Sequence, residues 1–495
     1  MLSASEVWRP AVSPLTRYYD DPDRFVLECI RFKPGDGPTD YQLEALRLLP
    51  KVKRLSIRMP HGGGKTALQS WVLLWFALTR DAAGVDWKVP STASVWRQLS
   101  RYLWPEVHKW ARRLRWDVIG RPAFRERKEL LDLSLQLEHG AAFALASDDE
   151  TAIEGAHADA LLYLFDEAKS IPAATFDAAE GALSGAGEDT GREAFALMCS
   201  TPGEPSGRFY DVQRRVAGTE DWHVRHVSLS ECIGAGRISA EWAEQRRKQW
   251  GEQSAVYQNR VLGEFAASAE NAVIPLSWVE AAVERWHEWQ EAGGEGEMTS
   301  LGADVGDVHD QTVLAPVYDR LYVGELRKYA GEGVMAAAGR TEAALRGTAA
   351  RAVVDVVGIG AGVVDRLRER WSLTRPGWSV VGFVAQGKSV RRDRAGEMGF
   401  VDLRAEAWWG LREQLDPGYD SEIALPPDDE LIGDLTAPAY EVESGGKYRI
   451  EAKDDLKKRI GRSTDAGDAV VMGLHTEVPV SAAGAGRRQV TVKRR

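Results

Sequence analysis

The 495-residue chain contains only 3 cysteines, and their positions exclude two kinds of protein. Cys29, Cys199 and Cys232 are far apart and form no Cys-x-x-Cys pair. An odd number of scattered thiols argues against a disulfide framework and against a zinc site. Such cysteine usage favours a reducing compartment.

The sequence also lacks long apolar runs and an excess of positive charge. No apolar run approaches the length of a membrane-spanning helix, and residues 1–12 contain no apolar segment typical of a signal peptide. The formal net charge of −11 argues against a polycation but leaves room for a local basic groove. We therefore expect a soluble intracellular protein, and its length indicates two or three domains.

One glycine-rich turn, His61-Gly62-Gly63-Gly64-Lys65-Thr66, has the pattern of a phosphate-binding loop. A short apolar strand pattern precedes it, and leucines and tryptophans at helical spacing follow it. Because glycines lack Cβ, successive N–H groups can turn toward one anion, while Lys65 reaches the β- and γ-phosphates and Thr66 holds Mg²⁺. We expect Lys65 to be an exposed loop residue. Met59 stands where the strict pattern has its first glycine, so an ordinary turn with a chance Gly-Lys-Thr is the alternative.

Upstream of this loop, Thr39 or Asp40 can cap a helix that begins near Gln42. The Gln42 amide could read the edge of an adenine base from there. An ordinary polar residue in the first helical turn explains it equally well.

A continuous apolar run, Ala160–Phe165, ends in Asp166 and Glu167. Such a run suits a strand buried on both faces of a parallel sheet, and ligand sites form at the carboxyl ends of these strands. We expect Asp166 to bind Mg²⁺ through water and Glu167 to orient and deprotonate the attacking water. The alternative is a solvated acidic strand end.

A later strand pattern, Ala194–Cys199, leads into Ser200 and Thr201. Hydroxyls at this place can sense the γ-phosphate and couple it to the rest of the protein, although Ser-Thr-Pro-Gly is also an ordinary turn. Strand and helix patterns alternate from 52 to 228, which predicts a mainly parallel α/β sheet with helices on both faces. A helical, tryptophan-rich stretch follows, in which Ala266–Asn271 is the expected joint.

Aspartates gather again in the second half of the chain. Asp304 and Asp355 each end a short apolar strand pattern, and Asp465 and Asp468 lie three residues apart on one face of a predicted helix. Carboxylate oxygens from separate elements are what a two-Mg²⁺ phosphodiester-cleaving centre requires. Ordinary helix caps and strand ends are the alternative.

Basic residues occur in five stretches: Lys51–Arg54, Arg121–Lys128, Lys388–Arg394, Lys447–Arg462 and Arg487–Arg495. Most such runs are solvated faces, but those flanking the second acidic cluster are suited to hold a phosphate backbone without reading its sequence. Residues 481–495 are expected to be a disordered basic tail.

Taken in order, these motifs resemble those of the large terminase subunit of tailed bacteriophages, the DNA-packaging motor. The resemblance runs from about Tyr41 to Leu474. It rests on Tyr41-Gln42, His61–Thr66, Ile153–Ala158 with Leu162–Lys169, Cys199–Gly203 with Ser206–Tyr210, Gly302–Gly306, Val354–Gly360 and Ser463–Ala469. Asp468 resembles the family's third nuclease ligand more closely than Asp465, which could cap the helix or share a metal.

The resemblance implies a P-loop ATPase domain over 1–230, a helical lid or connector over 231–295 and a ribonuclease-H-like endonuclease domain over 296–480. ATP with Mg²⁺ would drive translocation of double-stranded DNA, and one or two Mg²⁺ or Mn²⁺ ions would serve the nuclease. The implied partners are a small terminase subunit and the portal protein of the procapsid, on which copies form a ring in the cytoplasm of the infected host.

Two other functions fit the same residues. One is a helicase-like ATPase fused to a repair or resolvase nuclease, although the sequence shows no helicase motifs between the two parts. The other is a non-catalytic DNA-binding scaffold with degenerate sites.

Overall fold

The computed structural model describes residues 13–147, 153–185, 190–266, 271–306, 311–330, 333–374 and 379–475. They group into two compact units, the first within Met1–Arg246 and Tyr257–Ala267 and the second within Arg247–Val256 and Ser268–Arg495. Each unit has a sheet and a core of its own. In the described part of the chain, no helix combines the length and the apolar character needed to cross a membrane.

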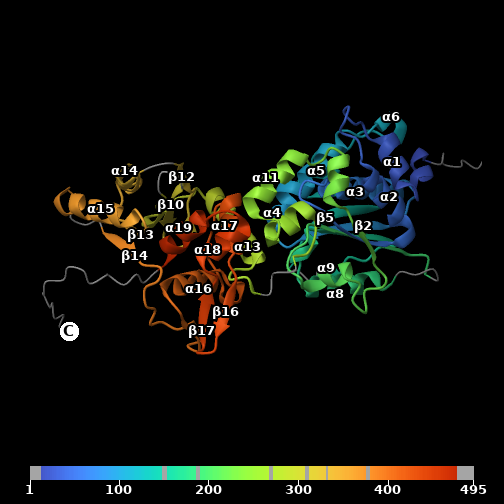
Figure 1. Cartoon of the computed structure of the whole chain (residues 1–495). Helices are drawn as coiled ribbons and strands as arrows, with labels where there is room; N and C mark the ends of the chain where they lie inside the picture. Colours follow the sequence, from blue (N-terminus) through green and yellow to red (C-terminus); the bar gives the residue numbers. More distant parts are fainter. Residues whose placement is uncertain are drawn as a thin grey trace, which may run out of the picture. The chain divides into compact units, whose positions relative to one another are not determined.

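The first unit is built on a sheet with the strand order β3-β4-β5-β2-β6-β7-β1-β8 (Figure 1). The strands are β1 Arg54–Arg58, β2 Trp87–Ala93, β3 Leu130–Leu131, β4 Ser134–Gln136, β5 Gly140–Ala146, β6 Ala160–Asp166, β7 Glu193–Ser200 and β8 His223–His226. From β5 through β8 in this order all neighbours are parallel, whereas β3 and β4 add an antiparallel edge. Parallel strands need long crossover connections, and the helices that lie between these strands in the chain confirm the alternation predicted for 52–228.

Helices cover both faces of this sheet. They are α1 Pro22–Cys29, α2 Asp40–Val52, α3 Lys65–Ala82, α4 Trp96–Gln98, α5 Trp104–Ala111, α6 Trp116–Ile119, α8 Ala173–Leu183, α9 Gly207–Gln213 and α10 Leu229–Gly234. Figure 1 shows α3 and α5 on one face of the sheet and α8 and α9 on the other.

The two covered faces explain why β6 is apolar at nearly every position. Leu162 and Leu164 pack into the core that contains the buried side chains of α3 and α5. The alternate residues Leu161, Tyr163 and Phe165 pack into a second core with α8 and α9. Successive side chains of a strand point to opposite faces, so a strand between two helical layers has no polar side.

The second unit contains a sheet with the order β11-β10-β9-β13-β14, and β12 also pairs with β10. The strands are β9 Met298–Asp304, β10 Gln311–Tyr318, β11 Tyr322–Val323, β12 Arg327–Ala330, β13 Arg351–Asp355 and β14 Val380–Phe383. The first strands form an antiparallel meander, and β13 and β14 then continue the sheet in parallel with β9. This is a ribonuclease-H-like arrangement, as the motif resemblance implies.

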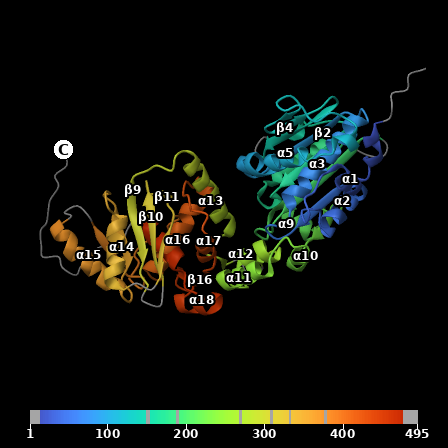
Figure 2. The same ribbon diagram turned by 90° about the horizontal axis from the view of Figure 1, so that it is seen from above.

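The remaining elements of this unit lie around that sheet. They are α13 Leu276–Glu291, α14 Val334–Ala344, α15 Gly360–Thr374, α16 Leu403–Leu415, α17 Asp429–Thr436, α18 Lys453–Ile460, α19 Asp465–Leu474, and a small sheet of β15 Gly399–Phe400, β17 Lys447–Ile450 and β16 Tyr440–Glu443. Figure 2 shows α14 and α15 on one side of the main sheet and α16 and α17 on the other.

The helix α19 lies very close to β9. A Cβ at Gly302 would lie 1.9 Å from the carbonyl oxygen of Ala469, so only glycine permits this approach. Leu301 and Ala303 point instead to the opposite face, into the core with α14 and α15. Gly302 thus sets the spacing between the strand that ends in Asp304 and the helix that carries the last two aspartates.

The expected connector, residues 231–295, is divided between the two units. α11, Ala240–Trp250, begins with the first unit and ends with the second, and α12, Ala255–Tyr257, leads back to the first. The segment from Tyr257 therefore packs with the first unit although the residues on both sides of it belong to the second. Most of the expected joint at Ala266–Asn271, and the whole expected tail at 481–495, lie outside the described residues.

Candidate nucleotide site and carboxylate centre

The glycine-rich loop connects the end of β1 to the start of α3. Gly62 and Gly64 have φ values of +83° and +89°, which side chains rarely tolerate. A Cβ at Gly63 would lie 2.7 Å from the sulfur of Met59, which is fully buried beneath the loop. Gly63 therefore leaves the space that is needed by the methionine at the usual first-glycine position.

Two side chains of α2 hold this loop through its carbonyl groups. Tyr41 donates its hydroxyl hydrogen to Gly63 O at 2.9 Å, and Gln42 donates from Nε2 to Gly64 O at 3.0 Å. Gln42 Oε1 accepts hydrogen bonds from the backbone and hydroxyl of Thr39, completing a capping box. The amide is fully buried and engaged with the chain, so the expected adenine contact would require these bonds to break.

The expectation that Lys65 is exposed is wrong. Its side chain is only 7% exposed, and its ammonium lies 3.6 Å from Oε1 of Glu167. The carboxylate that follows β6 is thus close enough to pair with the loop lysine. The sequence places the two residues about a hundred positions apart and so could not show this pairing.

Asp166, the last residue of β6, is 1% exposed and lies below the loop. Gln69 of α3 donates to its Oδ1 at 3.2 Å, whereas Oδ2 has no hydrogen-bond partner among the described residues. Burial, and then the charge of Glu167, raise the pKa of Asp166 to about 7. A buried carboxylate close to the helix that begins with Lys65 and Thr66 suits a Mg²⁺ ion.

The hydroxyls expected to couple the site to the rest of the protein do reach Glu167. Ser200 and Thr201 donate to its Oε2 at 3.1 and 3.4 Å. Glu167 itself has a left-handed backbone, with φ of +45°, at the turn after β6. The candidate base is therefore held by the loop lysine on one oxygen and by two hydroxyls on the other.

The segment after α12 also contacts this site, which the sequence did not indicate. The backbone N–H of His61 donates to Arg260 O at 2.8 Å. Asn259, which is buried, donates to Gly203 O at 3.2 Å, just beyond Thr201. One turn of chain thus contacts both the glycine-rich loop and the segment that holds Glu167.

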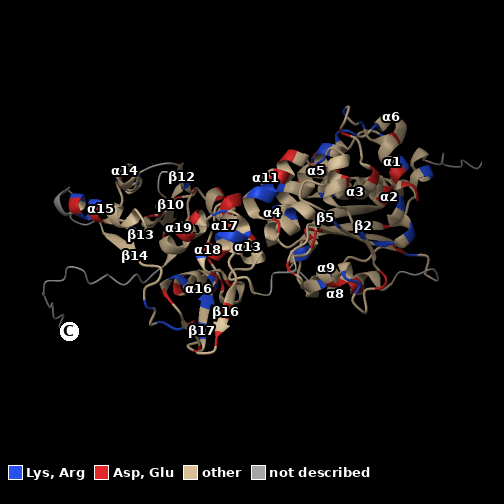
Figure 3. Ribbon diagram, in the orientation of Figure 1, with Lys and Arg blue, Asp and Glu red and all other residues tan. Residues whose placement is uncertain are grey.

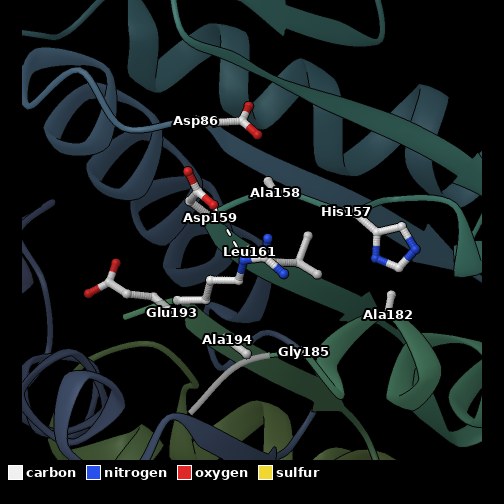
Figure 4. Close-up of a pocket in the computed structure, with 10 residues that line it drawn as sticks. Asp86, His157, Ala158, Asp159, Leu161, Ala182, Gly185, Glu193 and Ala194 are labelled. Atoms are coloured by element: carbon white, nitrogen blue, oxygen red, sulfur yellow. Dashed lines mark ion pairs between the residues drawn. The ribbon is translucent and has the colours of Figure 1, made fainter. Parts of the chain in front are cut away.

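A separate cavity of about 160 Å³ lies at the other end of the strands, near the amino ends of β2, β6 and β7 (Figure 4). It is lined by Asp86, His157, Ala158, Asp159, Leu161, Ala182, Gly185, Arg192, Glu193 and Ala194. Arg192 and Asp159 form an ion pair of 3.4 Å within it. None of the predicted site residues lines this cavity.

In the second unit, the structure brings the predicted aspartates to one end of the sheet. Asp304 and Asp355 are the last residues of β9 and β13, which are adjacent and parallel. Asp465 and Asp468 are in the first turn of α19. Because carboxyl ends of parallel strands meet at one edge, this is the arrangement that the strand and helix patterns predict.

A lysine that the sequence analysis did not single out lies among these carboxylates. The ammonium of Lys453, the first residue of α18, is 2.9 Å from Asp468 Oδ2, 3.1 Å from Asp304 Oδ2 and 3.6 Å from Asp465 Oδ1. It belongs to the basic stretch Lys447–Arg462, whose first residues lie on β17 (blue in Figure 3). The charge of a whole stretch does not reveal which of its members faces the acids.

The protonation of this centre follows from burial and from the lysine. Burial raises the pKa of Asp304 well above its ordinary value, and Lys453 only partly offsets this. Burial also disfavours the Lys453 ammonium, but the surrounding carboxylates outweigh it and raise its pKa. Asp468 shows the opposite balance, because Lys453 and then Arg404 lower its pKa against the effect of burial.

Among the described residues, no three His, Cys, Asp or Glu side chains have the spacing of a bound metal. In this structure a cation, the Lys453 ammonium, lies between three of the four carboxylates. The donor set of hard oxygens fits Mg²⁺ or Mn²⁺ once the ammonium moves away. Since Asp465 and Asp468 both face this ammonium, the preference for Asp468 stays a prediction.

No family model matches the chain. The probable terminase large subunit of Enterobacteria phage P7 is 26% identical over 329 residues, which cover 63% of this chain and 62% of that protein. The chain thus matches less than two thirds of the length of this relative. The relative is named for the same family that the order of motifs resembles.

Two solved structures also align with the chain. The nuclease domain of the large terminase subunit of bacterial virus Sf6 aligns at 20% identity and a TM-score of 0.35, covering 42% of this chain and 100% of that one. The large terminase of the thermophilic bacteriophage D6E in complex with ATP-gamma-S aligns at 12% identity and a TM-score of 0.39, covering 88% and 100%. Superpositions this weak carry no argument, so the fold assignment rests on the strand order of the chain itself. In its sequence and in the order of its motifs, the chain resembles the large subunits of phage terminases.

Proposed function

We propose that this chain is the large subunit of a tailed-phage terminase, which hydrolyses ATP to move double-stranded DNA into a procapsid and cuts concatemeric DNA. The observation that carries the proposal is the presence of two complete constellations in one chain. A glycine-rich loop faces a strand-end Asp-Glu pair in the first unit, and four aspartates meet on a ribonuclease-H-like sheet in the second. A motor that both moves and cuts DNA needs both.

In the first site, the loop from His61 to Thr66 would hold the phosphates of ATP, with Thr66 and Asp166 holding Mg²⁺. Lys65 would exchange its contact with Glu167 for the β- and γ-phosphates. This exchange frees one oxygen of Glu167 to accept the proton of the attacking water. Ser200 and Thr201, on the other oxygen, would keep the base in place and respond to the departure of the γ-phosphate.

In the second site, Asp304, Asp355, Asp465 and Asp468 would hold one or two Mg²⁺ or Mn²⁺ ions. When bound, these ions supply a polarised phosphate and an activated water. Lys453 would leave the carboxylates, and its ammonium could then pair with a phosphate of the DNA. Its side chain is 37% exposed, which leaves room for this movement.

Contacts with DNA should be mainly to phosphates, because a packaging motor must pass every sequence. By analogy with the family, the partners would be a small terminase subunit that selects the DNA and a portal protein on which copies assemble as a ring. The place of action would be the cytoplasm of the infected bacterium.

The test is a reciprocal pair of variants of the full chain. Asp304→Ala should hydrolyse ATP at the normal rate but leave supercoiled plasmid uncut in Mg²⁺ or Mn²⁺, since it removes one ligand of the dication site. Lys65→Ala should lose ATP hydrolysis and still nick the plasmid. In each variant, the activity that is kept shows that the same preparation is not globally unfolded.

Other outcomes would reject the proposal in distinct ways. Cutting that persists in Asp304→Ala would place the nuclease elsewhere, and strand separation by the wild-type protein would favour a helicase-like enzyme. A wild-type protein without ATP turnover or metal-dependent cutting would be a scaffold with degenerate sites.

A further inference from the structure

The carboxylate of Asp468 is held by donors on three different elements. The indole Nε1–H of Trp408 donates to Oδ1 at 3.1 Å, and the Thr464 hydroxyl donates to Oδ2 at 3.1 Å. The Lys453 ammonium also contacts Oδ2, at 2.9 Å. Two of these donors are neutral and one is charged.

Trp408 is fixed in place against the first turn of α19. It is 1% exposed, and a Cβ at Gly467 would lie 3.2 Å from its Cη2 atom and 2.9 Å from the Cβ of Asp434. The glycine between Asp465 and Asp468 is therefore the residue that lets the indole reach Asp468. An indole N–H can only donate a hydrogen bond, so in its contact with Asp468 the carboxylate oxygen is always the acceptor.

We infer that Trp408 and Thr464 are positioning residues for Asp468, which hold its carboxylate so that Oδ2, the oxygen that faces Lys453, is presented to a divalent cation. The inference rests on the proposed nuclease function of the centre. Of the three donors, Lys453 carries the charge that competes with a dication for Oδ2. Trp408 and Thr464 are neutral, so both can keep their bonds when the metal arrives, and a carboxylate oxygen has room for one hydroxyl donor and one metal.

Packing alone is the competing explanation for a buried tryptophan, and the neighbouring residue provides a matched control. Trp409 lies on the same helix, is 7% exposed and stacks on Tyr448 at 3.6 Å between ring centroids. Trp408→Phe and Trp409→Phe remove the same atoms from buried positions. Only the first removes a donor to Asp468.

The measurement is Mn²⁺ binding to the full chain by titration calorimetry, followed by plasmid cutting at a series of Mn²⁺ concentrations. Trp408→Phe should weaken Mn²⁺ binding by about 10- to 100-fold, as expected for the loss of an outer-shell donor. Cutting should fall at low Mn²⁺ and recover at high Mn²⁺. Trp409→Phe should stay within about two-fold of the wild type in both measurements.

Thr464 gives a second, independent pair of variants in case Trp408→Phe does not fold. Thr464→Val removes the hydroxyl and should weaken Mn²⁺ binding, whereas Thr464→Ser keeps it and should bind as the wild type does.

Wild-type affinity in Trp408→Phe and Thr464→Val, with wild-type cutting intact, would overturn this inference alone. Equal losses in Trp408→Phe and Trp409→Phe would assign Trp408 to packing and overturn it too. A wild-type chain that neither binds Mn²⁺ nor cuts DNA would overturn the nuclease function and this inference with it.

Discussion

Replacing Gln42 by methionine tests whether this residue holds the loop or reads the base. The exchange keeps the length of the side chain and removes its amide, which accepts from Thr39 N at 2.9 Å and donates to Gly64 O at 3.0 Å. Gly64 O keeps a second donor, the N–H of Leu68, so its loss is about 0.5–1.5 kcal/mol. Thr39 N–H loses its acceptor, which costs about 1–3 kcal/mol, whereas the Thr39 hydroxyl, which also donates to Gln42 Oε1, can rotate toward another acceptor.

The two losses together amount to about 3 kcal/mol, which corresponds to a fall of about 6–12 °C in the melting temperature of a domain of this size. The assay is thermal unfolding of the ligand-free chain, with turnover of ATP and GTP measured in parallel. If Gln42 holds the loop, the melting temperature falls and both turnovers decline together. An unchanged melting temperature with a loss confined to ATP would refute this reasoning and restore the adenine contact. Tyr41→Phe, which removes only the bond to Gly63 O, should cost about 1 kcal/mol.

Two further predictions concern the acids at the end of β6. Glu167→Gln should bind ATP but hydrolyse it about 10²- to 10⁴-fold more slowly with DNA present, because the amide keeps the shape and loses the base; near-normal turnover would remove Glu167 from catalysis. Asp166 has a pKa raised from 3.8 to about 7 in the folded protein, so the folded state binds the proton more tightly than the unfolded one. The metal-free protein should therefore lose stability as pH rises from about 4 to about 7 and level off above, as measured by melting temperature, and this part of the decline should be absent in Asp166→Asn. A melting temperature that rises over the same range in the wild type and not in the variant would contradict this.

The positions that the sequence predicted well are those at the ends of buried strands. Asp166, Asp304 and Asp355 each follow a short apolar run, and each is the last residue of its strand. The pattern was sufficient because an apolar run identifies a strand between two layers, and parallel strands bring their carboxyl ends to one edge. Local sequence and sheet topology therefore determine these positions together.

The contacts that the sequence could not predict join residues far apart in the chain. Lys453 lies 149 residues from Asp304, and Asn259 lies 56 residues from Gly203. No periodicity links such positions, and nothing in the composition distinguishes Lys453 from its basic neighbours. The same reason explains the error at Lys65, whose exposure depends on Glu167.

Both sites place a lysine beside carboxylates, and the choice of residue has a physical reason. Burial makes acids take up protons, as the raised pKa of Asp304 shows even beside Lys453, and a protonated acid is a poor ligand and a poor base. An ammonium on a flexible stem favours the charged acids and can still leave, whereas an arginine fork would bind a carboxylate at two points and compete more strongly with the ligand. In the proposed reaction, the phosphates of ATP would replace Glu167 as the partner of Lys65, and a phosphate of DNA would replace the carboxylates as the partner of Lys453 once a metal ion displaces it. Ligand binding at each proposed site would therefore be an exchange of partners for the lysine, and the acid that it releases would become available for chemistry in the same step.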